Sequence, residues 1–510
     1  MVRKLFFSIF ILGCISCQFN RTNKQPNIIL FFVDDLGWQD TSVPFWDKVT
    51  PLNEKYKTPN MERLQAKGVK FTNAYSTPVC SPTRVSLITG MNAARHRVTN
   101  WTLYPDKKQP MELNHPTLDF PEWNYNGVTT DQEVEQAAYA TPLAQLLKDN
   151  GYYTIHAGKA HFGALGYSSE NPQNLGFNVN IAGHAAGAPG SYLGMENYGN
   201  ADSRRGVWAV PGLEKYHGTP TFLTQALTQE ALSAVKKPLD SNQSFFLYLS
   251  LYAVHTPLMG NEKYFEAYLR NGLSYSEAKY ASMIESMDAA LGSVLDFVEE
   301  TEIDNETIIL FMSDNGGLSA VARDGAKHTH NAPLKSGKGS IYEGGIRVPM
   351  LAYWPGVTKS KTTVHTPVII EDFFPTILSI AGIKNYETVQ VVDGKNISPL
   401  LNGSNNNLSN RALYWHYPNE WGPEGPGIGS FSAIRKGEWK LIYFHEDQRY
   451  ELYDLSNDIG EQNNLASKEG SKLSELIALL SEYLISVEAQ MPRDKETQIQ
   501  IPYHTTKELF

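Results

Sequence analysis

Four short apolar runs along the chain predict its central strands. They are NIILFFV, YYTIHA, SFFLYLSLY and TIILFMS, and each is rich in aromatic and β-branched residues and has the length of a strand. The runs are continuous rather than alternating, which is typical of strands buried on both faces of a mainly parallel sheet. We therefore expect an α/β fold in which helices flank a mainly parallel central sheet.

Helical patterns lie between these runs. The stretch TPNMERLQAKGVKF has Pro59 near its start and Gly68 after its end, which is the usual asymmetry of a helix. Residues 276–300 carry an apolar stripe at helical spacing. We assign Met283 and Met287 of this stripe to the core and not to a cofactor site.

The pattern changes near residue 400. RALYWHY, FSAIRKGEWKLIYF and RYELYDLSND alternate and are separated by turn residues, which predicts an antiparallel sheet, and KLSELIALLSEYLISVEAQM then predicts an amphipathic helix. We expect a main domain over residues 27–400 and a smaller C-terminal antiparallel-sheet subdomain over residues 401–510.

The N-terminus resembles the signal of a bacterial lipoprotein. Two basic residues precede an apolar stretch over residues 5–15, which is too short to span a bilayer. We expect a signal region over residues 1–17, with Cys17 (or Cys14) as the lipidated residue, and a polar tether over residues 18–26. The alternative is an ordinary cleaved signal. The lipoprotein reading implies an exported protein, periplasmic or on the cell surface, anchored to the membrane through lipid only.

Composition narrows the possible partners. The chain has 510 residues, 41% hydrophobic and 19% charged, with a formal net charge of −10. An acidic chain argues against a nucleic-acid partner, which favours a basic surface. Processing at Cys17 would remove Cys14 and acylate Cys17, which would leave Cys80 as the only free thiol of the three cysteines. Counting alone favours an inert, buried thiol at Cys80, since a leftover cysteine is unusual in an exported protein.

Polar residues follow each apolar run, where ligands bind in open parallel sheets. Asp34 and Asp35 follow the first run, and Asp314 and Asn315 follow the last. These hard oxygen donors suit Ca²⁺ or Mg²⁺ better than zinc. The alternative for each pair is a turn or a helix cap, which is the commoner role of Asp and Asn after a strand.

A second set of residues is cationic or titratable. Its members are Arg84, Lys159, His161, His255 and Lys338. A dication with lysine and arginine suits an oxyanion, and histidines can transfer protons near neutral pH. Taken singly, each lysine is more often a solvated surface charge and each histidine a structural polar residue.

The stretch CSPTRVSLITG decides between these interpretations. Pro82 and Gly90 predict that a helix begins close to Cys80. Cys80 followed by x-Pro-Thr-Arg resembles the signature of the type I, formylglycine-dependent sulfatases, and DDLGW, GKAHFG, HTP, DNGG and KGSIYEGGIRVP resemble that family's other motifs in the same order. The resemblance covers nearly the whole chain from Asn27. It implies an alkaline-phosphatase-like fold and hydrolysis of sulfate esters, as in bacterial polysaccharide sulfatases.

The resemblance also implies roles for single residues. A maturation enzyme would oxidise Cys80 to formylglycine (3-oxoalanine), whose hydrate supplies the nucleophilic oxygen. One Ca²⁺ would be bound by an oxygen of the modified Cys80 together with Asp34, Asp35, Asp314 and Asn315. Arg84 would steady the aldehyde hydrate, and Lys159 and Lys338 would bind sulfate oxygens. His161 would contact the formylglycine hydroxyls and assist release of the enzyme-bound sulfate, and His255 would protonate the leaving alcohol.

Two positions depart from the family's pattern. Ala160 stands where tryptophan is common, and Leu258 stands where a second histidine is common. Neither position carries one of the roles above, but both can reshape the pocket.

The expected substrate is a sulfated carbohydrate, and algal polysaccharides such as ulvan or carrageenan are favoured over animal glycosaminoglycans. Candidate sugar contacts are residues 168–220, with His184, Arg204, Arg205 and His217, and the stretch ARDGAKHTHN, with Arg323, His328 and His330. The alternatives are a phosphoryl hydrolase of the same superfamily, a catalytically silent glycan-binding lipoprotein, and a structural role with Cys80 simply buried.

Overall fold

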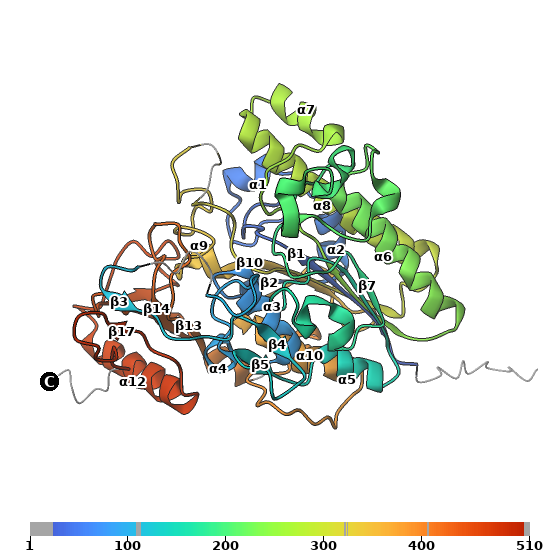
Figure 1. Ribbon diagram of the computed structural model, residues 1–510. Helices are drawn as coiled ribbons and strands as arrows, with labels where there is room; N and C mark the ends of the chain where they lie inside the picture. Colours follow the sequence, from blue (N-terminus) through green and yellow to red (C-terminus); the bar gives the residue numbers. More distant parts are fainter. Residues whose placement is uncertain (1–23, 109–113, 321–322, 324, 405–406, 504–510) are drawn as a thin grey trace, which may run out of the picture.

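The computed structural model describes residues 24–108, 114–320, 323, 325–404 and 407–503 (Figure 1). The predicted signal region, with Cys14 and Cys17, and most of the tether lie outside the described residues. Within the part of the chain that the structure describes, no helix combines the length and apolar composition that a membrane crossing requires.

A nine-stranded sheet forms the centre of the described chain, in the order β11-β2-β10-β9-β1-β8-β6-β7, with β12 beside β2. The four apolar runs supply its central strands, which are β1 (Asn27–Val33), β6 (Tyr153–Gly158), β8 (Phe245–Ser250) and β9 (Thr307–Ser313). β1 pairs in parallel with β8 and β9, and β6 pairs in parallel with β8. The predicted α/β fold with a mainly parallel sheet is therefore confirmed.

One inner strand runs in the opposite direction. β10 (Arg347–Tyr353) lies between β9 and β2 (Val69–Tyr75) and is antiparallel to both. The hydrophobic pattern does not reveal this direction, because a buried strand reads as a continuous apolar run either way. The sheet is completed by β7 (Val179–Ile181), β11 (Thr362–Val364) and β12 (Val368–Ile369).

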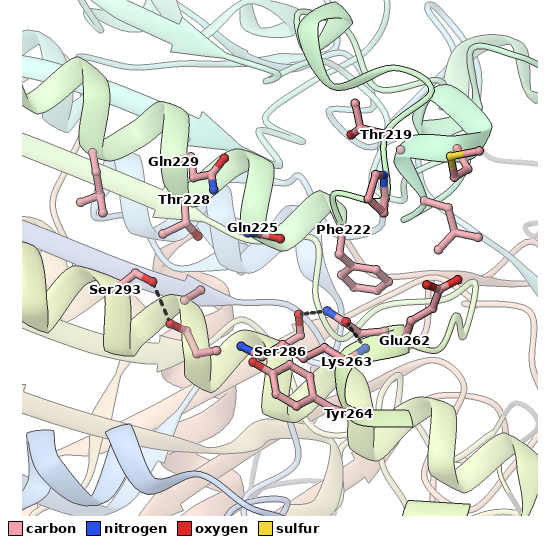
Figure 2. A pocket seen from close by; sticks show the side chains of 18 residues that line it. Thr219, Phe222, Gln225, Thr228, Gln229, Glu262, Lys263, Tyr264, Ser286 and Ser293 are labelled. Carbon is pink, nitrogen blue, oxygen red and sulfur yellow. Dashed lines mark hydrogen bonds between the residues drawn. The ribbon is translucent and has the colours of Figure 1, made fainter. Parts of the chain in front are cut away.

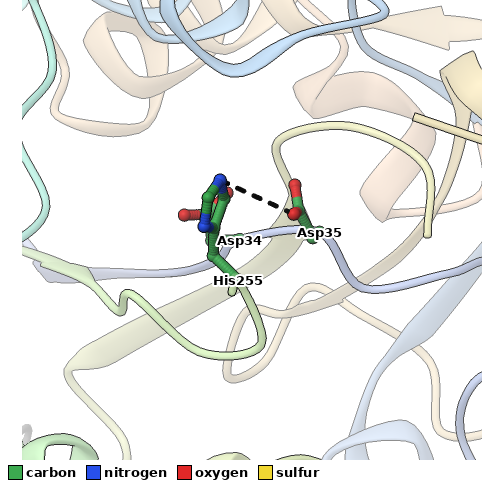
Figure 3. Close-up of side chains that lie close together, drawn as sticks. All are labelled: Asp34, Asp35 and His255. Carbon is green, nitrogen blue, oxygen red and sulfur yellow. Dashed lines mark ion pairs between the residues drawn. The ribbon is translucent and has the colours of Figure 1, made fainter. Parts of the chain in front are cut away.

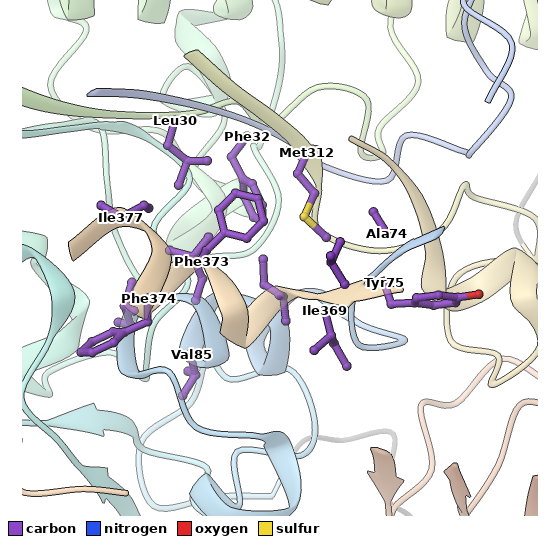
Figure 4. Close-up of a cluster of buried hydrophobic side chains, with 14 of the residues drawn as sticks. Leu30, Phe32, Ala74, Tyr75, Val85, Met312, Ile369, Phe373, Phe374 and Ile377 are labelled. Atoms are coloured by element: carbon purple, nitrogen blue, oxygen red, sulfur yellow. The ribbon is translucent and has the colours of Figure 1, made fainter. Parts of the chain in front are cut away.

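Helices cover both faces of the sheet, so alternate residues of β1 enter two different cores. Ile28, Leu30 and Phe32 belong to one hydrophobic cluster, and Ile29 and Phe31 belong to the other. The first cluster is closed by α3 (Cys80–Thr89), α5 (Leu143–Asp149) and α10 (Phe373–Ile380). Figure 4 shows Leu30 and Phe32 facing α10. The second is closed by α2 (Pro59–Lys67), α6 (Leu223–Asp240) and α8 (Tyr275–Glu300), on the opposite side of the sheet in Figure 1.

The C-terminal part forms a separate antiparallel sheet, as the alternating pattern predicts. Its strands are β13 (Ala412–Tyr417), β14 (Phe431–Lys436), β15 (Trp439–Phe444) and β16 (Tyr450–Asp454), in that order. Helix α12 (Gly470–Ser486) covers it through Leu476, Ile477 and Leu480. The domain boundary at residue 400 stays a prediction.

A buried charge cluster joins this sheet to the main body. Lys440 on β15 places Nζ 2.9 Å from Glu343 Oε1 and 2.8 Å from Glu461 Oε1, and all three side chains are fully buried. Glu343 begins α9 (Glu343–Ile346), next to the loop that carries Lys338. The C-terminal sheet therefore supports one wall of the site described below.

The remaining elements are short. They are α1 (Pro51–Lys55), α4 (Ala93–His96), β3 (Leu118–Asp119), β4 (Gly127–Thr129), β5 (Ala137–Tyr139), η1 (Ser168–Glu170), η2 (Pro172–Leu175), η3 (Gly194–Gly199), η4 (Ser203–Trp208), η5 (Glu214–Tyr216), α7 (Glu262–Arg270), η6 (Ile370–Asp372), α11 (Ser398–Leu401), η7 (Asn407–Asn410) and β17 (Arg493–Asp494).

Candidate active site

The ends of the four central strands meet at one edge of the sheet. Asp34 follows β1, Lys159 follows β6, His255 lies beyond β8 and Asp314 follows β9. Because these strands are neighbours in the order β9-β1-β8-β6, their carboxyl ends bring the four side chains together. Contacts among them show that the residues predicted from separate motifs form one cluster.

Arg84 anchors this cluster from helix α3. Its Nε and Nη2 donate to Oδ2 of Asp314 at 3.0 and 2.8 Å, and its Nη1 donates to the Lys159 carbonyl at 3.0 Å and to Ser250 Oγ at 2.6 Å. Its side chain is fully buried and does not line the cavity next to Cys80. The structure thus places Arg84 beneath the site, where it orients Asp314 and the Lys159 backbone.

The acidic residues form a tight set with two lysines. Lys159 Nζ donates to Asp34 Oδ2 at 2.7 Å, and Lys338 Nζ lies 2.7 Å from Asp35 Oδ1, which also accepts from Asn315 Nδ2 at 2.7 Å. Three oxygens remain buried without a hydrogen-bond partner among the described residues: Asp34 Oδ1, Asp35 Oδ2 and Asn315 Oδ1. Unpaired buried oxygens are costly unless a cation satisfies them. The donor set therefore fits a hard divalent metal such as Ca²⁺.

The pKa shifts of Asp34 and Asp35 also favour a bound cation. Burial and the neighbouring Asp314 carboxylate raise the pKa of Asp34. Burial would also raise the pKa of Asp35, but the charges of Lys338 and His255 hold it below its ordinary value. So many buried carboxylates repel one another, and a divalent cation would relieve that repulsion.

Cys80 is the first residue of α3, as the sequence predicts. The loop before it is fixed by Thr83 Oγ1, which accepts from the Thr77 amide at 3.0 Å. Cys80 forms no disulfide within the described part of the chain, and burial raises the pKa of its thiol. An unmodified Cys80 would therefore be a neutral thiol and a poor nucleophile, despite its place at a helix N-terminus.

Two histidines of the site each have one ring nitrogen close to a backbone carbonyl and one without a hydrogen-bond partner among the described residues. His161 Nε2 lies 2.8 Å from the Thr102 carbonyl, and His255 Nδ1 lies 2.8 Å from the Thr256 carbonyl. A carbonyl can only accept, so these nitrogens carry the protons and leave His161 Nδ1 and His255 Nε2 as bases. His255 Nε2 lies 3.8 Å from Asp35 Oδ2, as Figure 3 shows beside Asp34. Burial, followed by the charge of Lys338, lowers the pKa of His255 to about 3.

Two residues of the site have an uncommon backbone conformation. Asp35 and His161 have φ values of 59° and 53°, a left-handed conformation that is uncommon outside glycine. Gly187 packs against the His161 ring, where an added Cβ would lie 2.2 Å from Cε1. Such constrained backbone is concentrated at functional sites, because the surrounding structure must offset its cost.

A cavity of about 520 Å³ adjoins Cys80. His161, His255 and Lys338 line it on the side of the acidic cluster. The other walls include Trp101, Trp208 and Trp421, which the sequence analysis missed. The available signal was a tryptophan in each of three polar loops, but loop tryptophans occur for many reasons.

Two family models match the chain that carries this site. Residues 26–383 match the sulfatase family model, and residues 337–490 match the model for the C-terminal region of N-sulphoglucosamine sulphohydrolase.

The chain belongs to the sulfatase family.

Relatives and solved structures agree with this assignment. This sulfatase is 30% identical to a sulfatase of Formosa agariphila over 90% of its own length and 87% of the relative's. It is 29% identical to the N-acetylgalactosamine-6-sulfatase of Canis lupus familiaris, over 77% and 69% of the two chains. The crystal structure of Ps i-CgsB in complex with k-i-k-neocarrahexaose superposes with a TM-score of 0.71 at 26% identity, covering 95% of this chain and 96% of that one. The expected alkaline-phosphatase-like fold and sulfuric ester hydrolase class are confirmed.

The predicted sugar contacts of the sulfatase divide into two groups. Arg205, on η4, lines the Cys80 cavity. Arg204 pairs with Asp202 on the surface, His184 is buried against the Tyr252 hydroxyl, and His217 packs on the Tyr198 ring. Only Arg205 of these four lines the cavity.

The second predicted group lies elsewhere. Arg323 is buried, with Nη1 3.4 Å from Asp40 Oδ2 and its guanidinium 3.9 Å from the centre of the Tyr280 ring. With His330 it lines a different pocket, and His328 packs against Gly425. None of these three is among the residues that line the Cys80 cavity. Their role as sugar contacts stays a prediction.

Another cavity of about 460 Å³ lies between α6, α8 and the start of α7 (Figure 2). It is lined by Gln225 and Gln229 of α6 and by Ser286 of α8, which accepts from Asn261 Nδ2 at 2.9 Å. It shares no lining residue with the Cys80 cavity. Its polar but largely uncharged lining offers no catalytic arrangement.

Proposed function

We propose that this sulfatase releases sulfate from a sulfated carbohydrate, with formylglycine at position 80 and one Ca²⁺ in the acidic cluster. The observation that carries the proposal is the convergence at one cavity of Cys80, two histidines and Lys338, next to buried carboxylates with unpaired oxygens. Lysines beside carboxylates can hold a divalent anion, and the cavity has room for the group that carries it.

The residues present determine which groups would hold these cofactors. Ca²⁺ would bind to Asp34, Asp35, Asp314 and Asn315, because three of these residues present unpaired buried oxygens. Formylglycine, once formed from Cys80, would supply a hydrated aldehyde as the nucleophile. A bound Ca²⁺ would supply positive charge at the sulfate oxygens. Cys80 would receive its modification from a formylglycine-generating maturation enzyme.

The cationic side chains bind and orient the sulfate group. Lys338 lines the cavity, and Lys159 lies 2.7 Å from Asp34 and 4.0 Å from Asp314. Both are buried, so their charges act in a medium of low dielectric constant. Arg84 holds Asp314 and the Lys159 backbone in place. Its role in steadying the aldehyde hydrate stays a prediction.

The histidines move protons at defined atoms. His161 Nδ1 is unprotonated and buried without a partner among the described residues, so it can take a proton from the nucleophile at residue 80. His255 lines the cavity, and once its Nε2 has gained a proton it can pass that proton to the leaving oxygen. A bound sulfate group would raise the low pKa of His255, since a nearby anion favours the imidazolium.

The carbohydrate assignment draws on the relatives. The structure with 26% identity contains neocarrahexaose, and the 29% identical relatives are named for N-acetylgalactosamine sulfate. We favour an algal polysaccharide or its oligosaccharides, such as carrageenan or ulvan. Export as a lipoprotein anchored at Cys17 or Cys14 would place the enzyme where such glycans arrive.

The test is a screen of desalted sulfated oligosaccharides for released sulfate, with Ca²⁺ present and after co-expression with a maturation enzyme. We expect release from at least one glycan class and none from the Cys80→Ala variant. Release of phosphate from phosphate esters, without sulfate release, would favour a phosphoryl hydrolase of the same superfamily. Binding of glycans with no release of either anion would favour a silent binding protein.

A further inference from the structure

The cavity beside Cys80 has a second half that sulfate binding does not use. Its walls include Trp101, Trp208 and Trp421, which come from three separate segments and are each partly exposed. Arg205 completes the lining on the side of η4. Three indoles around one opening are an unusual concentration, since tryptophan makes up only 9 of 510 residues.

Two of the tryptophans are set on a small rigid base. Trp101 and Trp208 pack against Leu103, Ala185 and Ala186, which form a hydrophobic cluster of their own. The Trp208 carbonyl also accepts from the Gly190 amide at 2.6 Å. These rings are therefore held by packing and do not move freely in a loop.

Trp421 is fixed on another part of the cavity wall. Its ring lies over Gly339, where an added Cβ would be 2.1 Å from Cε3. Lys338 Nζ lies 5.8 Å from the centre of the ring, so the indole borders the sulfate end of the cavity. Asn100 connects this wall to the first, since its Nδ2 donates to the Glu420 carbonyl at 2.9 Å and its Oδ1 accepts from the Trp101 amide at 2.9 Å.

A pyranose ring suits such walls. One face of the sugar presents C–H groups with partial positive charge, and the face of an indole carries partial negative charge. Preformed aromatic walls bind the ring without first paying to order their side chains. The aromatic half of the cavity therefore fits the sugar that carries the scissile sulfate or the next sugar along the chain.

Arg205 adds a charge to this aromatic site. It is exposed, and within the described residues its side chain makes no hydrogen bond or ion pair. Its neighbour Arg204 already holds Asp202, with Nη2 2.9 Å from Oδ2. Lys338 already forms an ion pair with Asp35. Arg205 is thus the available cation at the sugar end, and a guanidinium binds carboxylate or sulfate through two parallel hydrogen bonds.

We propose that this half of the cavity is a subsite for a pyranose with an anionic group in addition to the scissile sulfate. Trp101, Trp208 and Trp421 contact the ring, and Arg205 pairs with the additional group, which is a second sulfate or a carboxylate. The inference rests on the proposed function and deepens it, because it names a polyanionic glycan and not a singly sulfated sugar as the preferred substrate.

The test uses pairs of sulfated disaccharides that differ by one sulfate or one carboxylate, built on galactan and glycosaminoglycan backbones. kcat/KM for sulfate release is measured with the matured enzyme. We expect Arg205→Gln to lower kcat/KM about tenfold for the member with the additional anion and to leave its partner unchanged. The pair that responds identifies the anion as sulfate or carboxylate. Arg204→Gln is the matched control and should change neither value.

Binding separates this inference from the proposed function. The same sugars are titrated calorimetrically into a Cys80→Ala variant, alone and combined with Arg205→Gln or Trp208→Ala. We expect Arg205→Gln to weaken only the sugar with the additional anion and Trp208→Ala to weaken both members. An equal effect of Arg205→Gln on both members, or no effect, would overturn the subsite. Absence of sulfate release with Arg205-dependent binding intact would instead overturn the proposed function.

Discussion

Arg84 and Asp314 form a fully buried ion pair beneath the site, in which Nε and Nη2 both bond to the single oxygen Oδ2. Among the described residues, the other carboxylate oxygen, Oδ1, accepts a hydrogen bond only from the Asp35 amide, at 3.3 Å. One side of Asp314 is therefore fixed by Arg84, and the other side faces the acidic cluster. A helix residue four positions after Cys80 thus orients a residue at the end of β9.

Removal of Arg84 should destabilise the fold because it leaves Asp314 as an unpaired buried charge. We expect Arg84→Met to lower the free energy of unfolding by about 3–5 kcal/mol. The double variant Arg84→Met with Asp314→Asn should recover much of this loss but no activity. Denaturant titration with parallel sulfate-release assays measures both. Equal instability of the single and double variants would show that the ion pair is not the cause.

Calcium should stabilise the folded enzyme even before Cys80 is modified, because most of the proposed ligands are present in the unmodified chain. At free Ca²⁺ a hundred times the Kd, the gain is about 2.7 kcal/mol. Thermal unfolding with Ca²⁺, with Mg²⁺ and with a chelator measures it. Asp34→Asn should abolish the shift, whereas Asp288→Asn, at a buried carboxylate of α8, should retain it. A full shift in Asp34→Asn would contradict the proposed site.

His255 should matter most when the leaving group is poor. Protonation by a positioned side chain contributes about 10²–10⁴-fold. We expect His255→Gln to lower kcat by that range on a sugar sulfate and to change it little on an aryl sulfate, whose leaving oxygen needs no proton. Steady-state kinetics on both substrates is the measurement. Equal losses on both would assign His255 to binding instead of proton transfer.

The stability of the fold should depend on pH through Glu371, which lies away from the site. Burial, then the charge of Asp372, raises the pKa of Glu371 from 4.5 to about 8. The folded chain therefore holds a proton that the unfolded chain has lost, so stability falls as pH rises from about 4.5 to about 8. Full ionisation costs roughly 5 kcal/mol.

Glu371→Gln mimics the protonated carboxyl and should remove this fall. Free energies of unfolding measured at about pH 5, 6.5 and 8 should decline less steeply with pH for the variant than for the parent chain. Parallel declines would mean that Glu371 is already ionised in the folded protein.

Much of the fold followed from hydrophobic pattern alone. The runs that became β1 and β9 are continuous because both faces of the sheet are covered. In the C-terminal sheet, Ile434 enters the cluster beneath α12 and Ala433 enters the main-body cluster, so both faces of that sheet are covered as well, although its strands alternate in the sequence. The antiparallel direction of β10 could not be predicted, because strand direction depends on how the strands are connected and not on the hydrophobic pattern. The cluster at the strand ends could be predicted, because the carboxyl ends of parallel strands lie at the same edge of the sheet.

The sugar side of the cavity was not readable to the same degree. Arg205 and Arg323 look alike in the sequence, yet one lines the cavity and the other is buried against Asp40 and Tyr280. Trp101 and Trp421 lie 320 positions apart and meet through Asn100. Such contacts arise from loop conformation, for which the chain carries no periodic signal.

The chemical state of residue 80 tests the central claim most directly. Mass spectrometry of the peptide containing Cys80 is combined with sulfate-release assays on the same preparations, made with and without a maturation enzyme. We predict an aldehyde or its hydrate at position 80, with activity proportional to the fraction converted. A preparation that is fully active and contains only the unmodified thiol would contradict the account.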